Sequence, residues 1–263
     1  MNKTELQQRL LKGTGVTYYQ HIPVGIGTSP SLFISVHGWS RNVLEHAHDF
    51  LPFARAYGVV LVTPLFEARR FPHYQRLGRD IGKGRADLIL NRIVDTVRLE
   101  IGVKRLPLFL FGYSGGGQFV QRYTMAYPDR VMRLALGAPG WYTFPDPAHP
   151  FPLGIASIKQ LPDIHFNPSA FLKISTKVLV GELDTRRNHH LNTSKRVDQM
   201  QGVNRQERAL RWIQSMTAAA RACNYNTIYT LELLPNSDHS FHRCMEKGGM
   251  GDAAFSFLFG PRP

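Results

Sequence analysis

The chain has 263 residues, a length that suits one large domain or two small ones, and 43% of them are hydrophobic, which leaves ample material for a core. Lys and Arg number 32 against 19 Asp and Glu, so the net charge is +13. The basic residues are scattered and belong to no recognisable nucleic-acid module, so we expect a solvated basic surface and no nucleic-acid partner.

Cysteine content and the N-terminal segment indicate the compartment. Cys223 and Cys244 are too few for a disulfide framework, and we expect both to be free thiols. Residues 1–15 lack the apolar run of a signal peptide, and no segment approaches a membrane span. We therefore expect one domain over residues 1–263, no membrane insertion and a cytoplasmic location. The oligomeric state is left open.

The first quarter of the chain predicts the start of a sheet. Residues 5–11 predict a short helix, strands are predicted at 16–22, 31–36 and 59–63, and residues 42–57 predict a helix. The strand at 31–36 ends in a loop that begins with His37-Gly38-Trp39-Ser40.

A possible metal motif lies in the helix predicted at 42–57. His46, His48 and Asp49 are residue types that bind zinc. Residues two apart on a helix face different directions, however, so the spacing suits a chelate poorly. We favour a partly exposed helix face and predict no metal site.

The most informative stretch lies in the middle of the chain, after a helix predicted at 87–100. An apolar strand predicted at 106–111 leads into Gly112-Tyr113-Ser114-Gly115-Gly116, and a helix is predicted to follow. This is the G-x-S-x-G pattern in a strand–turn–helix context, where the turn is so tight that glycines flank the serine. Ser114 is therefore the predicted nucleophile.

A nucleophilic serine needs a base, and the base needs a group that fixes its tautomer. A strand predicted at 175–180 ends in a loop that carries Glu182 and Asp184, and we choose Asp184 because Glu182 stands closer to the strand. A helix at 206–223 and a last strand at 227–234 precede a loop with His239, the predicted base. His242 is the alternative base, and a helix predicted at 252–259 closes the chain.

Attack on a carbonyl creates an oxyanion, which needs preorganised N–H donors. We expect one from Gly115, directly after the nucleophile, and the other from Trp39, with Ser40 as the alternative. His37 precedes the serine in the chain, and we expect it to be structural.

Residues 139–168 contain seven prolines and several aromatic residues. Proline density argues against long helices, so we predict a mostly irregular cap or lid insertion at 139–175. A surface loop whose aromatics seal the core edge is an equal alternative. We expect Tyr113, Trp141 and Tyr142 to contact substrate.

These motifs together resemble the α/β-hydrolase superfamily from near residue 16 to near residue 259. The chain is most similar to esterase and poly(3-hydroxyalkanoate)-depolymerase-like members. The resemblance implies an α/β fold with a mostly parallel twisted sheet, helices on both faces, and the chain order serine, acid, histidine. It implies no cofactor.

The expected activity is hydrolysis of a small or short polymeric carboxylic ester through an acyl-enzyme. An amidase or peptidase, or an acyltransferase, would use the same three residues. A non-catalytic sensor or scaffold of this fold is a third class, because fold does not fix function. The basic surface adds a minor hypothesis, an anionic or polymeric substrate.

Overall fold

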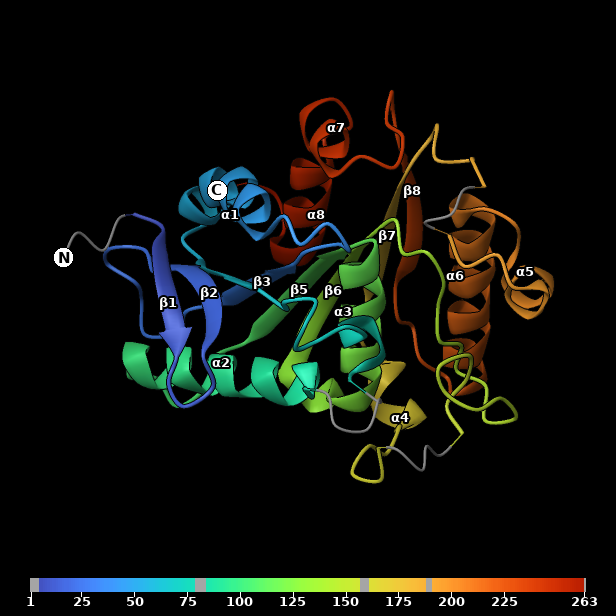
Figure 1. The fold of residues 1–263 in the computed structure, drawn as a ribbon, viewed down its shortest axis with the longest axis horizontal. Coiled ribbons are helices and arrows are strands. Elements are labelled where there is room, and N and C mark those ends of the chain that lie inside the picture. The colour runs from blue at the N-terminus through green and yellow to red at the C-terminus, as the bar shows by residue number, and fades with distance from the viewer. Residues whose placement is uncertain (1–4, 79–83, 157–160, 188–190, 263) are drawn as a thin grey trace.

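The computed structural model describes residues 5–78, 84–156, 161–187 and 191–262. Within them the strands form one sheet in the order β1-β2-β4-β3-β5-β6-β7-β8 (Figure 1). The strands are β1 (Gln7–Leu11), β2 (Val16–His21), β3 (Leu32–Val36), β4 (Val60–Pro64), β5 (Leu108–Tyr113), β6 (Val131–Gly137), β7 (Thr176–Gly181) and β8 (Tyr229–Leu234). From β4 to β8 all neighbours pair in parallel, and β1 and β2 form an antiparallel edge.

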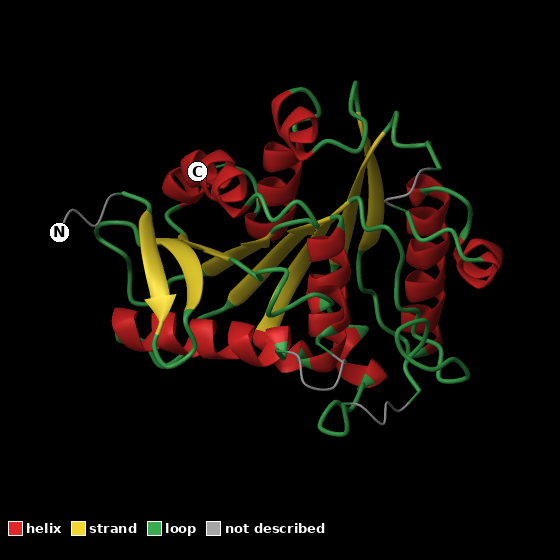
Figure 2. Cartoon of the chain, viewed as in Figure 1, coloured by secondary structure: helices red, strands yellow, loops and turns green. Residues whose placement is uncertain are grey.

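Helices cover both faces of the sheet (Figure 2). α1 and α8 pack on one face, and α2, α3 and α6 lie on the other. The helices are α1 (Val43–Tyr57), α2 (Ala86–Ile101), α3 (Gly115–Ala126), α4 (Pro168–Phe171), α5 (Lys195–Gln201), α6 (Arg205–Ala222), α7 (Phe241–Glu246) and α8 (Met250–Phe259). Because both faces are covered, every residue of β3 and β4 is buried, as the continuous apolar runs of a parallel sheet require.

The parallel arrangement positions the predicted functional residues. The carboxyl ends of β3, β5, β7 and β8 lie at the same edge of the sheet, so the loops that leave these strands meet there. The motifs that carry Trp39, Ser114, Asp184 and His239 follow these four strands in that order.

The helix predicted at 5–11 is wrong, because Gln7–Leu11 forms β1. It pairs with β2 from Gln7↔Gln20 to Leu11↔Val16, across a turn in which Gly13 and Gly15 have positive φ. A short run of Gln, Arg and Leu is compatible with either state, and its partner strand decides the outcome. The other predicted helices and strands are present, with bounds shifted by a few residues. The short helices α4, α5 and α7 were not predicted.

The segment predicted as a cap, 139–175, is mostly irregular and ends near α4; residues 157–160 lie outside the described residues. Most of its aromatic side chains are buried, among them Tyr142, Phe144 and Phe151, whereas Phe166 is partly exposed. This packing favours the alternative in which the aromatics seal the core edge. The lid stays a prediction.

Among the described residues, no helix combines the length and apolar character needed to cross a bilayer.

Candidate active site

The turn between β5 and α3 presents Ser114 in a strained conformation. Its φ of 51° and ψ of −110° lie outside the regions that L-residues favour. The turn is held because the Ser114 N–H donates to the Gly137 carbonyl at 2.7 Å. A Cβ on Gly116 would lie 2.1 Å from the Val36 carbonyl oxygen, so only glycine allows α3 to start this close to β3.

The structure brings the side chains of Ser114, His239 and Asp184 together. His239 Nε2 lies 3.1 Å from Ser114 Oγ, and His239 Nδ1 lies 2.7 Å from Asp184 Oδ2. A carboxylate only accepts hydrogen bonds, so Nδ1 carries the proton and Nε2 is free to accept the serine hydroxyl proton. Asp184 is buried, whereas 20% of the His239 side chain is exposed.

The loops that carry the acid and the histidine are bonded to each other. The Leu183 N–H donates to the Ser237 carbonyl at 2.9 Å, and the Asn236 N–H donates to the Glu182 carboxylate at 2.6 Å. Glu182 thus braces the histidine loop from outside, while Asp184 faces the ring. His242, the alternative base, is exposed and lies near Glu246.

Arg205 is a neighbour of the acid that the sequence analysis missed. Its Nη1 donates to Asp184 Oδ1 at 3.0 Å, and both side chains are almost completely buried. Arg205 is the first residue of α6, and the next residue, Gln206, donates to the carbonyls of Gly181 and Glu182. The N-terminus of α6 therefore holds both the backbone and the carboxylate of the acid loop.

The loop after β3 is fixed by His37, which is fully buried. Its Nε2 accepts the Phe66 N–H at 3.0 Å, so Nδ1 carries the proton and donates to the Gly38 carbonyl at 2.8 Å. Burial lowers the pKa of His37 to about 4, so the ring is neutral near pH 7. A trans peptide points its C=O and N–H in opposite directions, so this bond also turns the Trp39 N–H away from the His37 ring.

Gly38 and Trp39 lie beside the serine turn. A Cβ on Gly38 would be 3.6 Å from Ser114 Cβ, and a Cβ on Gly115 would be 2.8 Å from Trp39 Cδ1. The Trp39 indole is half-exposed, and the Arg41 guanidinium lies 5.5 Å from its ring centre. The two predicted oxyanion donors therefore belong to adjoining backbone segments.

The three residues expected to contact substrate are largely buried. The Tyr113 ring stacks on His239 with centroids 5.4 Å apart, and its hydroxyl lies 3.7 Å from Cys244 Sγ. Tyr142 stacks on Trp212 at 5.0 Å, and Trp141 packs 4.4 Å from the Arg122 guanidinium. Tyr113 supports the histidine ring, and the other two offer little side-chain surface to a ligand. Substrate contact by these residues stays a prediction.

The side chains of the possible metal motif separate in space. His46 is fully buried, not partly exposed as predicted: its Nδ1 lies 2.7 Å from Ser35 Oγ and its ring stacks on Phe241 at 3.8 Å. Its spacing from Val43 and Phe50 places it on the inner face of α1.

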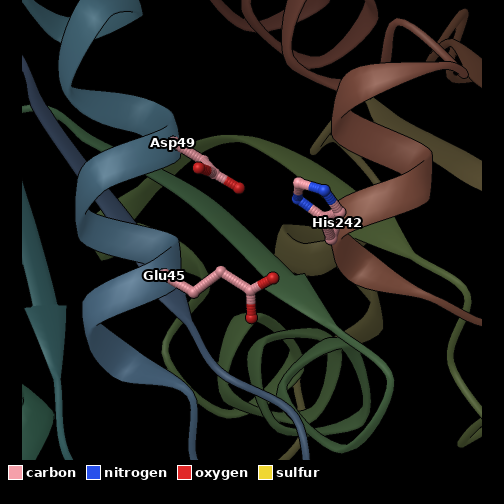
Figure 3. A group of neighbouring side chains, drawn as sticks. All are labelled: Glu45, Asp49 and His242. Carbon is pink, nitrogen blue, oxygen red and sulfur yellow. The ribbon is translucent and has the colours of Figure 1, made fainter.

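A different trio, Glu45, Asp49 and His242, has ligand atoms within 4.8 Å of one another (Figure 3). The two carboxylates project from α1 one turn apart, and His242 reaches toward them from α7. Burial and the negative charge of Glu45 raise the pKa of Asp49. Glu45 accepts a hydrogen bond from Asn42, and the trio is partly open to solvent.

Both cysteines are free thiols, as predicted. Cys223 is exposed and Cys244 is buried beside Tyr113. Burial raises the pKa of the Cys244 thiol to about 11.

No protein-family model matches the chain, and no curated protein does. Solved structures do resemble it. Poly(aspartic acid) hydrolase-1 from Sphingomonas sp. KT-1 is 25% identical, with a TM-score of 0.80 over 97% of this chain and 99% of that one. A poly(3-hydroxybutyrate) depolymerase from Bordetella parapertussis is 20% identical, with a TM-score of 0.79 over 98% and 92% of the two chains.

An S-formylglutathione hydrolase from Agrobacterium tumefaciens is more distant, at 13% identity and a TM-score of 0.58 over 97% of this chain and 94% of that one. These likenesses confirm the fold class predicted from the sequence and the similarity to esterase- and depolymerase-like proteins.

Proposed function

We propose that the chain is a serine hydrolase that cleaves carboxylic esters, because it has the α/β-hydrolase fold and its structural neighbours are hydrolases and esterases. The observation that carries this proposal is the line of contacts from Ser114 through His239 to Asp184, at 3.1 and 2.7 Å. A serine on a strained turn, with a base in reach and a buried acid behind it, suits acyl transfer.

The reaction begins with attack of Ser114 Oγ on the ester carbonyl, while His239 Nε2 takes the hydroxyl proton. The tetrahedral intermediate collapses, and His239 donates this proton to the leaving alcohol. Water, which gives a proton to the same nitrogen, then attacks the acyl-enzyme. The bond between the acyl carbon and Ser114 Oγ breaks, the acid leaves, and His239 returns the proton to Ser114 Oγ. Asp184 holds the Nδ1 proton throughout and stabilises the imidazolium.

The Gly115 and Trp39 N–H groups are the proposed oxyanion donors, with the Ser40 N–H as the alternative. Gly115 begins α3, whose N-terminal N–H groups have no partners within the helix and favour negative charge. The His37–Gly38 hydrogen bond supports Trp39 because it fixes the peptide to which this N–H belongs. No metal or cofactor takes part in these steps.

Hydrolysis of p-nitrophenyl esters of increasing acyl length tests the proposal. We expect the wild type to hydrolyse the esters and to react with a fluorophosphonate. Ser114→Ala should not be labelled, and its kcat should fall by at least about 10⁴-fold. Ser169→Ala, an exposed serine bonded to Asn167, is the matched control and should match the wild type. A wild type that neither turns over nor labels would favour a sensor or scaffold.

The same three residues would serve an amidase, a peptidase or an acyltransferase. A paired panel of esters and amides separates the first two from an esterase, and product analysis with an added alcohol detects acyl transfer. Amide turnover comparable to ester turnover would replace the ester proposal.

An anionic polymer is a second candidate substrate class. It is favoured by the net charge of +13 and by the similarity to a protein described as a poly(aspartic acid) hydrolase. A groove of about 640 Å³ is lined by Arg69, Arg70, Arg85 and Arg92. Of these, Arg85 is paired with Asp87 and Asp163, and Arg70 and Arg92 donate to backbone carbonyls.

Turnover of poly(aspartic acid) and of a neutral polyester, each measured against ionic strength, tests this candidate. Turnover of the anionic polymer that falls steeply with salt would support it. Turnover of the neutral polyester alone would exclude it.

A further inference from the structure

The acid Asp184 is buried between two basic groups, of which the mechanism above uses one. Its Oδ2 faces His239, and its Oδ1 accepts a hydrogen bond from Arg205. The exposed fractions of the Asp184 and Arg205 side chains are 2% and 1%, so solvent does not screen this pair. A full positive charge therefore stands beside the acid even when His239 is neutral.

Two buried arginines on the same helix show that the contact of Arg205 is unusual. Arg208, three residues further along α6, donates to the carbonyls of Gly140, Asn192 and Gly202 and to Asp198. Arg208 thus ties together several backbone segments. Arg205 donates to Asp184, and in the described part of the chain its Nε and Nη2 have no hydrogen-bond partner. Its interactions are concentrated on the acid.

The groups that surround His239 come from several parts of the fold. They are Tyr113 and Ser114 from the serine turn, Asp184 from the loop after β7, Arg205 from α6, and Asp238, Arg243 and Cys244 from the histidine loop and α7.

The exposed pair Asp238–Arg243 is internally balanced, at 3.1 Å. Burial raises the pKa of Tyr113 well above its usual value and that of Cys244 to about 11, so both are neutral near pH 7. Among the described residues, Asp184 and Arg205 are therefore the unscreened charges that act on the imidazole.

We propose that Arg205 is a positioning residue that holds the Asp184 carboxylate and shares its charge, so that His239 stays unprotonated, and able to act as base, at lower pH. An acid alone would favour the imidazolium strongly, because opposite charges attract at this range. Arg205 offsets part of that attraction. The part that remains stabilises the imidazolium that forms in the transition state. This inference rests on the proposed function.

The test is the pH dependence of kcat/KM for a p-nitrophenyl ester, measured for wild type, Arg205→Gln, Arg205→Lys and Arg208→Gln. An amide at 205 can still donate to Asp184 but carries no charge. We expect the acidic limb of the kcat/KM pH profile of Arg205→Gln to move to higher pH by about one unit, since a nearby charge shifts protonation by that order. Arg205→Lys keeps the charge and should restore the wild-type limb, even where kcat is lower.

Arg208→Gln is the matched control, because it removes a buried charge from the same helix away from the acid. We expect it to lose stability and to keep the wild-type limb. The proposal is overturned if Arg205→Gln loses activity equally at all pH values, as a purely structural residue would. The pH dependence of fluorophosphonate labelling gives a second readout that needs no turnover.

Folding of Arg205→Gln is itself informative. If it does not fold, Asp184→Asn combined with Arg205→Gln removes both charges. Recovery of the fold in this double variant would support charge sharing, and continued failure would contradict it. A wild type without turnover or labelling would defeat the proposed function, whereas an active wild type with an unmoved limb in Arg205→Gln defeats this inference alone.

Discussion

Two histidines follow parallel strands at the same edge of the sheet, and they are held in different ways. His37, after β3, is fully buried, and both ring nitrogens bond to backbone groups. His239, after β8, is partly exposed, and its ring nitrogens face the side chains of Asp184 and Ser114. A ring between two backbone groups keeps its proton and fixes a loop, whereas a ring between a carboxylate and a hydroxyl can exchange one. Position after a strand alone does not tell the two apart.

Replacing His239 gives the largest expected effect. His239→Gln should lower kcat by about 10³–10⁴-fold, because the serine loses its base while the residual contacts still bind substrate. Its urea midpoint should stay close to that of the wild type, since the ring is partly exposed. Turnover within tenfold of the wild type would refute the assigned role.

Burial of the neutral His37 ring should make the free energy of unfolding depend on pH. Its pKa is about 4 in the folded chain and near 6.5 when unfolded, so the unfolded chain binds the proton first as pH falls. This contribution to the free energy of unfolding is complete above about pH 7 and declines toward pH 4, by about 3 kcal/mol in total. Urea unfolding from pH 7.5 to 4.5 measures it. In His37→Gln this term is absent, so the difference in unfolding free energy between variant and wild type, about 2 kcal/mol at pH 7.5, should close as the pH falls to 4.5. A constant difference would contradict this.

Replacing His37 should give the smallest effect on activity and a clear effect on stability. At pH 7.5, His37→Gln loses two buried hydrogen bonds and ring contact with Tyr74, which should cost about 2 kcal/mol. A loosened Gly38–Trp39 peptide should also lower kcat by about tenfold. Unfolding curves and ester turnover measure both quantities. A loss of turnover as deep as that of His239→Gln, with stability unchanged, would reverse the two assignments.

The sequence predicts the serine turn and the two loops well because each depends on local chemistry. A glycine-flanked serine between a strand and a helix has few other conformations, and the parallel sheet then brings the downstream loops to it. The helix prediction for residues 5–11 failed because a short polar run has no strong local preference and becomes a strand when it pairs with β2. His46 could have been placed from the sequence, since it follows Val43 and precedes Phe50 at helical spacing.

Arg205 could not have been found in the sequence. It lies 21 residues beyond Asp184, and an arginine at a helix start is ordinary. The contact depends on how α6 packs against the loop after β7, which no local pattern encodes. Tyr142 is a similar case: an aromatic residue in a proline-rich stretch can face solvent or the core, and only the position of Trp212 decides.

The hydrogen bonds of Thr143 determine where this chain can be re-engineered. Its N–H and carbonyl are both bonded to the Gln121 side chain on α3, and its carbonyl also accepts the Trp212 indole N–H from α6. A foreign loop that replaces Thr143 would remove the residue that links the helices carrying the serine turn and Arg205. A graft that begins beyond Thr143 leaves that link intact, so insertion libraries aimed at new substrates should start there.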